Sequence, residues 1–204
     1  MVNKHISLLN NKNKQELTSF FIVLLAFILF QQYKNIIYFP SDSGDYWELS
    51  ATNILKDFPK ESFRGYFFPM LLWPAHWLTD VFQLSTPLVY RIYSSIIYAY
   101  AFTLILPNFY IKIFGGIATI SRRLISPCIV LLLFPGIILY PLSDLPSFIL
   151  MSCSIAALLS LKKISQLTMT HGLKIAGAGC LAYGAYNTRT IYLFPLIGVF
   201  LFFH

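Results

Sequence analysis

The sequence predicts an all-α membrane protein: a polytopic helix bundle of about six spans, with a first external loop that carries short interfacial helices. Three observations lead to this fold class. The 204 residues are 57% hydrophobic and 11% charged, whereas an ordinary soluble domain carries about 25% charged residues. Apolar runs of the length that crosses a bilayer recur along the chain. The basic residues stand in short clusters between these runs.

Six apolar runs are the expected spans. The first, Leu17–Tyr33, follows a lysine-bearing N-terminus. No small-residue cleavage site comes after it, so we expect a retained span rather than a removed signal peptide. The others are Ile92–Ile111, Leu124–Ser143, Leu145–Leu161, Ile175–Thr188, and the run from Thr190 to the C-terminus.

Residues 40–86 are expected to form the first external loop, because charged residues concentrate in its first part. Trp47, Ala51 and Leu55 recur there at spacings close to helical turns. The pattern predicts a short amphipathic helix from Asp45 to Lys56, lying along the membrane surface, with Asp42 or Ser43 near its start.

The segment Tyr66–Phe82 is ambiguous, because it is apolar but is interrupted by Pro69 and Pro74. The positive-inside rule decides its placement. With a cytoplasmic N-terminus and an interfacial 66–82, nine of the 15 basic residues fall in the cytoplasm: Lys4, Lys12, Lys14, Lys112, Arg122, Arg123, Lys162, Lys163 and Lys174. We therefore expect a multi-pass protein of the cell membrane in which residues 1–204 form one transmembrane module.

Composition also excludes several function classes. Cys128, Cys153 and Cys180 all lie in apolar runs, which opposes a disulfide framework or a zinc site. The net charge of +7 comes from loop clusters that report topology, so we expect no nucleic-acid partner. The chain contains no Walker or dinucleotide-binding motif.

Ionisable residues from distant parts of the chain are predicted on one extracytoplasmic face, and such residues at a membrane boundary are site candidates. They are Asp42, Asp45, Arg64, Asp144 and Arg189, with Arg91 as a further candidate. Each has a structural alternative: the acids can cap helices or solvate loops, and the arginines can anchor the interface.

These residue types suit a group transfer that releases phosphate. A carboxylate can accept the proton of an attacking hydroxyl while guanidinium groups hold the departing phosphate. Asp42-Ser43-Gly44-Asp45 also offers oxygens of the kind that divalent cations prefer. No ligand cluster implies a metal, however, so the cofactor stays unknown.

Four segments carry a family resemblance. They are Asp42-Ser43-Gly44-Asp45-Tyr46-Trp47-Glu48-Leu49-Ser50, Arg64-Gly65-Tyr66-Phe67-Phe68-Pro69-Met70-Leu71-Leu72, Ser143-Asp144-Leu145-Pro146 and Gly184-Ala185-Tyr186-Asn187-Thr188-Arg189. Their order behind a basic N-terminus and a first span resembles the GT-C superfamily of membrane glycosyltransferases. The bacterial relatives of protein mannosyltransferases and of the lipid A aminoarabinose transferase are the most similar members.

The resemblance implies an inverting glycosyltransferase. Such enzymes move a sugar from a polyprenyl-phosphate carrier to a lipid or glycan acceptor on the outer side of the membrane. By the resemblance, Asp42 is the general base, and Asp45 is a second loop acid that departs from the commoner pair of adjacent acids. Asp144 matches the second acidic position, and Arg189 is expected to bind the carrier phosphate. Residue type and position alone make Arg64 and Arg91 further candidate phosphate ligands.

Members of that superfamily usually have more spans than are expected here. The sequence is therefore also compatible with a truncated frame, a fragment, or a half that needs a partner. A different class remains open as well: a non-catalytic membrane component of a polysaccharide polymerase or flippase.

Overall fold

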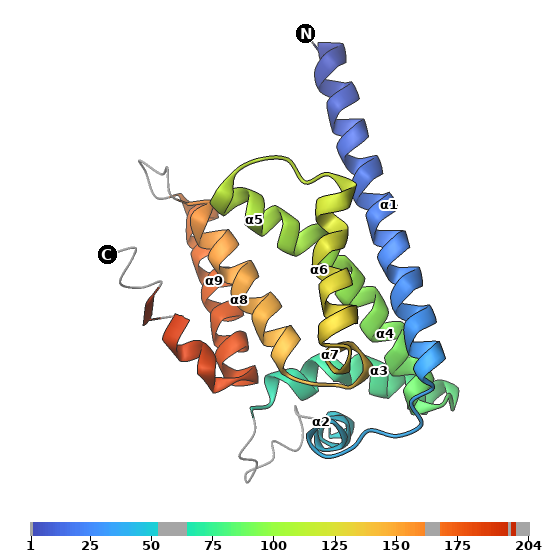
Figure 1. The fold of residues 1–204 in the computed structure, drawn as a ribbon. Coiled ribbons are helices and arrows are strands. Elements are labelled where there is room, and N and C mark those ends of the chain that lie inside the picture. Colours follow the sequence, from blue (N-terminus) through green and yellow to red (C-terminus); the bar gives the residue numbers. More distant parts are fainter. Residues whose placement is uncertain (1, 53–64, 162–167, 196, 199–204) are drawn as a thin grey trace. The chain divides into compact units, whose positions relative to one another are not determined.

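The structure, a computed structural model, describes residues 2–52, 65–161, 168–195 and 197–198. Every regular element in these residues is a helix (Figure 1), which confirms the all-α class. Two helices, Asn13–Lys34 and Thr86–Phe114, are long and apolar enough to cross a membrane, and Asp144–Leu159 is a shorter apolar helix. Length and composition thus support two membrane helices in the described residues, whereas the sequence predicts about six spans.

The chain divides into two compact units. Unit 1 consists of Met1–Ile37 and Tyr90–Leu139, and unit 2 consists of Tyr38–Val89 and Tyr140–His204. Each unit is therefore assembled from segments that are far apart in the sequence.

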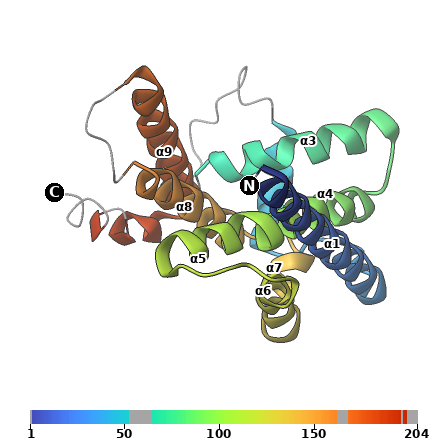
Figure 2. The ribbon, with the colours of Figure 1, turned by 90° about the horizontal axis from the view of Figure 1, so that it is seen from above.

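Unit 1 is built around the long helix α1 (Val2–Lys34). Helix α4 (Thr86–Tyr100) continues through a π-helical turn, η1 (Ala101–Ile105), into α5 (Leu106–Phe114), and α6 (Ile120–Leu133) and the short α7 (Gly136–Leu139) follow. Helix α1 packs against η1 and α6 (Figure 2). At the centre, the ring of Phe27 meets Phe102 edge to face, with 6.0 Å between the ring centroids.

The predicted span Leu124–Ser143 is interrupted in the structure. Helix α6 ends at Leu133, and the four residues of α7 form a separate turn. Pro135 explains the break, because a proline disfavours the helical conformation of the residue before it. Phe134 accordingly has φ −134° and ψ 47°. A charge-free run was not enough to predict a continuous helix.

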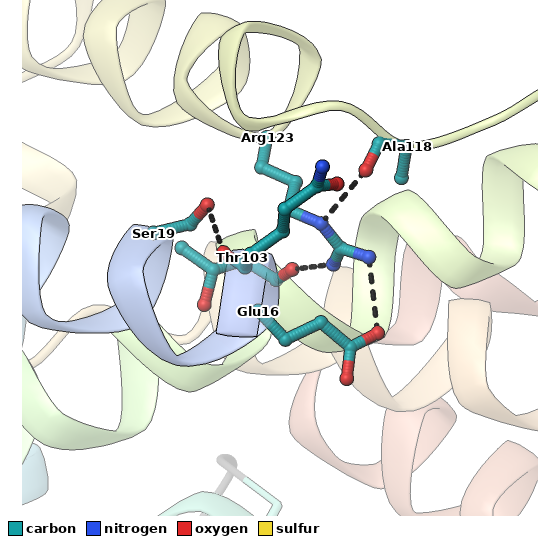
Figure 3. Close-up of polar contacts among 6 residues, drawn as sticks. Glu16, Ser19, Thr103, Ala118 and Arg123 are labelled. Carbon is teal, nitrogen blue, oxygen red and sulfur yellow. Dashed lines mark hydrogen bonds and ion pairs between the residues drawn. The ribbon is translucent and has the colours of Figure 1, made fainter. Parts of the chain in front are cut away.

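An ion pair between a buried arginine and a partly buried glutamate holds one end of unit 1 together (Figure 3). Arg123, in the first turn of α6, donates from Nη2 to Glu16 Oε1 on α1 at 3.0 Å and from Nε to the carbonyl of Ala118 at 3.2 Å. Its Nη1 donates to the carbonyl of Thr103. Pro107 has no N–H to offer the carbonyl four residues earlier, so the guanidinium supplies the donor that the helix lacks.

Arg123 was therefore only partly anticipated. The sequence places Arg122 and Arg123 together in a solvated basic loop, but the Arg123 side chain is 1% exposed and Arg122 is exposed. The Glu16 carboxylate offsets the desolvation cost of burying Arg123, because a charge is stable inside a protein only when it is paired and hydrogen-bonded.

The other end of α1 is held by side-chain hydrogen bonds to α4. The amide of Gln31 donates to the hydroxyls of Ser95 at 2.9 Å and Ser94 at 3.3 Å on α4. Arg91 donates to the side-chain oxygen of Gln32. Helices α1 and α4 are thus joined by polar contacts at the place where α1 ends and α4 begins.

Unit 2 contains an antiparallel pair of helices, α8 (Asp144–Leu159) and α9 (Met169–Thr188), followed by the 3-10 turn η2 (Thr190–Tyr192). The small residues of α9 allow close packing against α8: Ala178, Ala182 and Ala185 are buried. Ser154 on α8 donates to the carbonyl of Ala178 at 2.8 Å. The glycines Gly177 and Gly179 are exposed and have open space beside them, so the alanines make this contact.

Two shorter helices complete unit 2. Figure 1 shows α2 (Asp42–Ala51) and α3 (Phe67–Phe82) at the end of the pair where α8 begins and α9 ends. The expected amphipathic helix Asp45–Lys56 exists but begins three residues earlier; the predicted positions 53–56 lie outside the described residues. Its N-cap is Ser41, with φ 47°, rather than Asp42 or Ser43, and the Ser41 side chain makes no capping hydrogen bond.

Candidate functional site

Helix α2 is fixed to α3 by its apolar and hydroxyl face. The Trp47 ring lies on the imidazole of His76, with 5.1 Å between the ring centroids, and Phe39 covers Trp47 from the preceding loop at 5.5 Å. The hydroxyl of Ser50 lies 3.2 Å from His76 Nδ1 and donates to the carbonyl of Trp47. His76 is therefore a packing residue of this joint, and the fully buried Ser50 has no access to a substrate.

Helix α2 also touches the start of α8 through Tyr46. The Tyr46 hydroxyl bonds the Ser143 hydroxyl at 3.3 Å, immediately before Asp144. The Tyr46 ring meets Phe68 edge to face at 5.0 Å. One side chain thus connects three of the four segments that carry the family resemblance.

The start of α3 fits tightly against the end of α9. The backbone N–H of Phe67 donates to the Asn187 side-chain oxygen at 2.8 Å. A Cβ on Gly65 would overlap the Asn187 carbonyl, and a Cβ on Gly184 would lie 2.8 Å from the Phe67 ring. Position 65 needs glycine because the backbone of Asn187 lies too close for a side chain, and at position 184 the Phe67 ring leaves little room for one.

An ion pair joins α8 to the residue after α9. Asp144, in the first turn of α8, contacts Nη1 of Arg189 through Oδ1. Their side chains are 44% and 46% exposed. The hydroxyl of Tyr192 interacts with Ser147 and with both charges of the pair. A half-exposed guanidinium beside hydroxyl groups is suited to receive an anionic group such as phosphate.

The four resembling segments therefore close into a ring of contacts within unit 2, here called the contact ring. Tyr46 binds Ser143, Asp144 binds Arg189, Asn187 binds Phe67, and Phe68 packs on Tyr46. The contacts of this cluster join residues that are up to 120 positions apart in the sequence. Of the residues that sidedness placed on one face, Asp144 and Arg189 contact each other directly.

Asp42 and Asp45 lie in the first turn of α2, where the helix dipole favours negative charge, and both are exposed. Asp42 is one turn before Tyr46, so the two share a face of the helix. Gly44 lets this turn approach the loop before it, because a Cβ there would lie 2.8 Å from the carbonyl oxygen of Phe39. The contact of Tyr46 with Ser143 ties the helix that carries the two acids to the residue before Asp144.

The remaining candidates are placed differently. Arg64 lies outside the described residues. Arg91 belongs to unit 1, where it is 8% exposed and donates to Gln32. The structure therefore gives Arg91 a packing role at the α1–α4 joint, which is the anchoring alternative in a buried form.

Several residues of the site were not singled out from the sequence. Ser143 and Asn187 lie within the resembling segments, and Ser147 and Tyr192 lie within predicted spans. The one available signal was their position next to a predicted charged residue: Ser143 precedes Asp144, and Asn187 and Tyr192 flank Arg189.

The described residues contain no group of three histidine, cysteine or acidic side chains that could hold a metal ion. The chemistry available at the contact ring is that of one carboxylate, hydroxyls, an amide and one guanidinium, and the first turn of α2 adds the carboxylates of Asp42 and Asp45. Such a set can accept a proton and bind an anion. Comparison of the chain with protein-family models, with curated proteins and with solved structures gives no significant match.

Proposed function

We propose that the chain takes part in the transfer of a sugar from a polyprenyl-phosphate-linked donor to a lipid or glycan acceptor at the extracytoplasmic face of the cell membrane. The observation that carries the proposal is the contact ring. It brings together the four segments whose order resembles the GT-C glycosyltransferases, and it joins an acid and an arginine at one end of α8 and α9.

In this proposal Asp42 accepts the proton of the acceptor hydroxyl, with Asp45 as a supporting acid. The resulting oxygen attacks the anomeric carbon, the bond from that carbon to the phosphate oxygen breaks, and the configuration inverts. Arg189 stabilises the charge that grows on the departing phosphate. Asp144 and Tyr192 lie next to the arginine that receives the phosphate.

The membrane arrangement that we propose has about six spans, a cytoplasmic N-terminus and an interfacial α3. Two contacts in unit 1 are compatible with it. Glu16 and Arg123, both assigned to the cytoplasmic side, contact each other, and Gln31 contacts Ser95 where the opposite side is expected. In unit 2, Phe67 at the start of α3 contacts Asn187 and Gly184 near the end of α9.

The decisive experiment compares Asp42→Asn with Glu48→Gln. Both substitutions remove one exposed carboxylate from α2, but only Asp42 is assigned to the reaction. We expect Asp42→Asn to abolish transfer to the envelope glycan, measured by mass spectrometry, while Glu48→Gln retains it and both proteins accumulate equally in membranes. Unchanged glycan in Asp42→Asn would refute the transferase proposal and favour the non-catalytic membrane component.

A labelling experiment tests the shared face. Single cysteines at positions 42, 144 and 189, in a background that lacks Cys128, Cys153 and Cys180, are treated with a membrane-impermeant maleimide from outside. All three are expected to react in intact cells. Protection of any one of them, with labelling restored after lysis, would contradict a common extracytoplasmic site.

A further inference from the structure

We propose that Asp144 is a resident competitor for the anion site at Arg189: in the free protein its carboxylate occupies the guanidinium, and a phosphate group has to displace it. The inference rests on the proposed function only in assigning phosphate to Arg189. It gives Asp144 a positioning and specificity role that differs from proton transfer.

The Asp144–Arg189 pair is built to be displaced. Both side chains are close to half exposed, and an ion pair in that setting is weak because water screens it. The Glu16–Arg123 pair in unit 1 shows the opposite design. There the arginine is 1% exposed, and two backbone carbonyls bind the guanidinium in addition to the carboxylate.

The Arg189 guanidinium also has donors left for a ligand. Among the described residues, Asp144 is its hydrogen-bonding or ionic partner, and the contact uses one nitrogen of a group that offers five N–H donors. Phosphate oxygens match the planar fork of arginine bidentately, which a single carboxylate contact does not exploit. A phosphate therefore gains more from Arg189 than Asp144 loses.

The competition has a consequence for selectivity. A neutral or weakly charged head group cannot replace the carboxylate, so Asp144 restricts the site to phosphate-bearing ligands. When phosphate occupies Arg189, the carboxylate is released beside it, and the two negative charges repel. Asp144 thus lowers the affinity for phosphate and favours the departure of the carrier phosphate after transfer.

The test measures binding of farnesyl phosphate to the full chain in detergent micelles, with farnesol and inorganic phosphate as separate probes. Removing the competing charge in Asp144→Asn should tighten farnesyl phosphate binding about two- to fivefold, and Arg189→Gln should abolish it in both backgrounds. Asp80→Asn is the matched control, because it removes an exposed carboxylate that pairs with His76 instead; its affinity should equal that of the wild type. Unchanged or weaker binding in Asp144→Asn would overturn the proposal.

A second measurement uses the wild-type chain and does not depend on the folding of a variant. Carbodiimide modification of Asp144, read by peptide mass spectrometry, should increase when farnesyl phosphate is added, because the carboxylate loses its arginine partner. A decrease or no change would overturn the competition. Inorganic phosphate that has the same effect as farnesyl phosphate would identify a free anion as the ligand, and an effect limited to farnesyl phosphate would identify a lipid head group.

Sugar transfer assayed in the same preparations separates the two proposals. If the wild type transfers sugar but Asp144→Asn does not bind more tightly, the competition proposal is wrong and the transferase proposal stands. If Asp144→Asn binds more tightly but the wild type does not transfer sugar, the competition proposal stands and the transferase proposal is wrong.

Discussion

The hydroxyl of Tyr46 bonds the hydroxyl of Ser143 at 3.3 Å, across 97 positions of sequence. Both residues are buried, at 9% and 5% exposure. This contact ties the helix that carries Asp42 and Asp45 to the residue before Asp144. The geometry of the candidate site therefore depends on a pair of neutral hydroxyls as well as on charges.

A double-mutant cycle tests this tie. Tyr46→Phe keeps the ring that packs on Phe68 and removes only the hydroxyl, and Ser143→Ala removes its partner. Each single substitution should lower the free energy of unfolding by about 1 kcal/mol, measured by denaturation in mixed micelles. The double variant should lose little more than either single variant, because both remove the same bond. Fully additive losses would show that the two hydroxyls act separately.

The two close approaches at Gly65 and Gly184 give a second prediction. Gly65→Ala should destabilise unit 2 by about 1–3 kcal/mol or more, because its Cβ would collide with backbone at Asn187. Gly184→Ala should cost less, since the atoms that it meets belong to the Phe67 ring.

Gly177→Ala is the control for both glycine substitutions. It lies on the same helix as Gly184 but has open space around it, so alanine should stabilise α9 by about 0.5–1 kcal/mol through helix propensity. Thermal midpoints in one detergent order the three variants. A destabilised Gly177→Ala with a neutral Gly65→Ala would contradict the packing at the start of α3.

The sequence predicted the parts of the fold that depend on composition. Runs without charge located α1, the α4–α5 helix, α8 and α9, and breaks in hydropathy located α2 and α3. The exact ends were decided by local backbone chemistry. Helix α2 begins behind Pro40 and the positive φ of Ser41, and α6 ends before Pro135. The spacing of apolar residues predicts neither of these helix ends.

The partners of the polar residues were beyond the sequence. Sidedness grouped Asp42, Asp144 and Arg189, and the structure joins Asp144 to Arg189. The sequence did not reveal that Tyr46 contacts Ser143 or that Asn187 contacts Phe67, because a hydroxyl or an amide can form hydrogen bonds with almost any polar neighbour. Likewise, the positive-inside rule counts arginines without separating the exposed Arg122 from the buried Arg123.

The amide of Gln31 gives a third prediction. It is 3% exposed and donates to Ser94 and Ser95, so Gln31→Leu leaves buried hydroxyls without their donor. We expect a loss of about 1–3 kcal/mol. Tyr33→Leu, on the same helix at 81% exposure, should change the free energy of unfolding by less than about 0.5 kcal/mol. Equal losses in the two variants would contradict a specific joint between α1 and α4.

The ion pair of Glu16 and Arg123 gives the last prediction. Arg123→Gln removes the donor to the Thr103 carbonyl and the charge that pairs with Glu16, while Glu16→Gln removes the carboxylate from the buried guanidinium. Each should destabilise the protein by about 3–5 kcal/mol.

The apolar double variant Glu16→Leu/Arg123→Met should recover most of that loss, because it removes both charges and their desolvation costs together. Arg122→Gln is the matched control: its side chain is exposed and donates to the carbonyl of Ile117, so stability should hardly change. Under the proposed topology, Arg122 still supplies a cytoplasmic charge in the double variant, and maleimide labelling at position 144 should therefore stay extracytoplasmic. Loss of stability in Arg122→Gln equal to that in Arg123→Gln would mean that the two adjacent arginines share one role, which their different burial argues against.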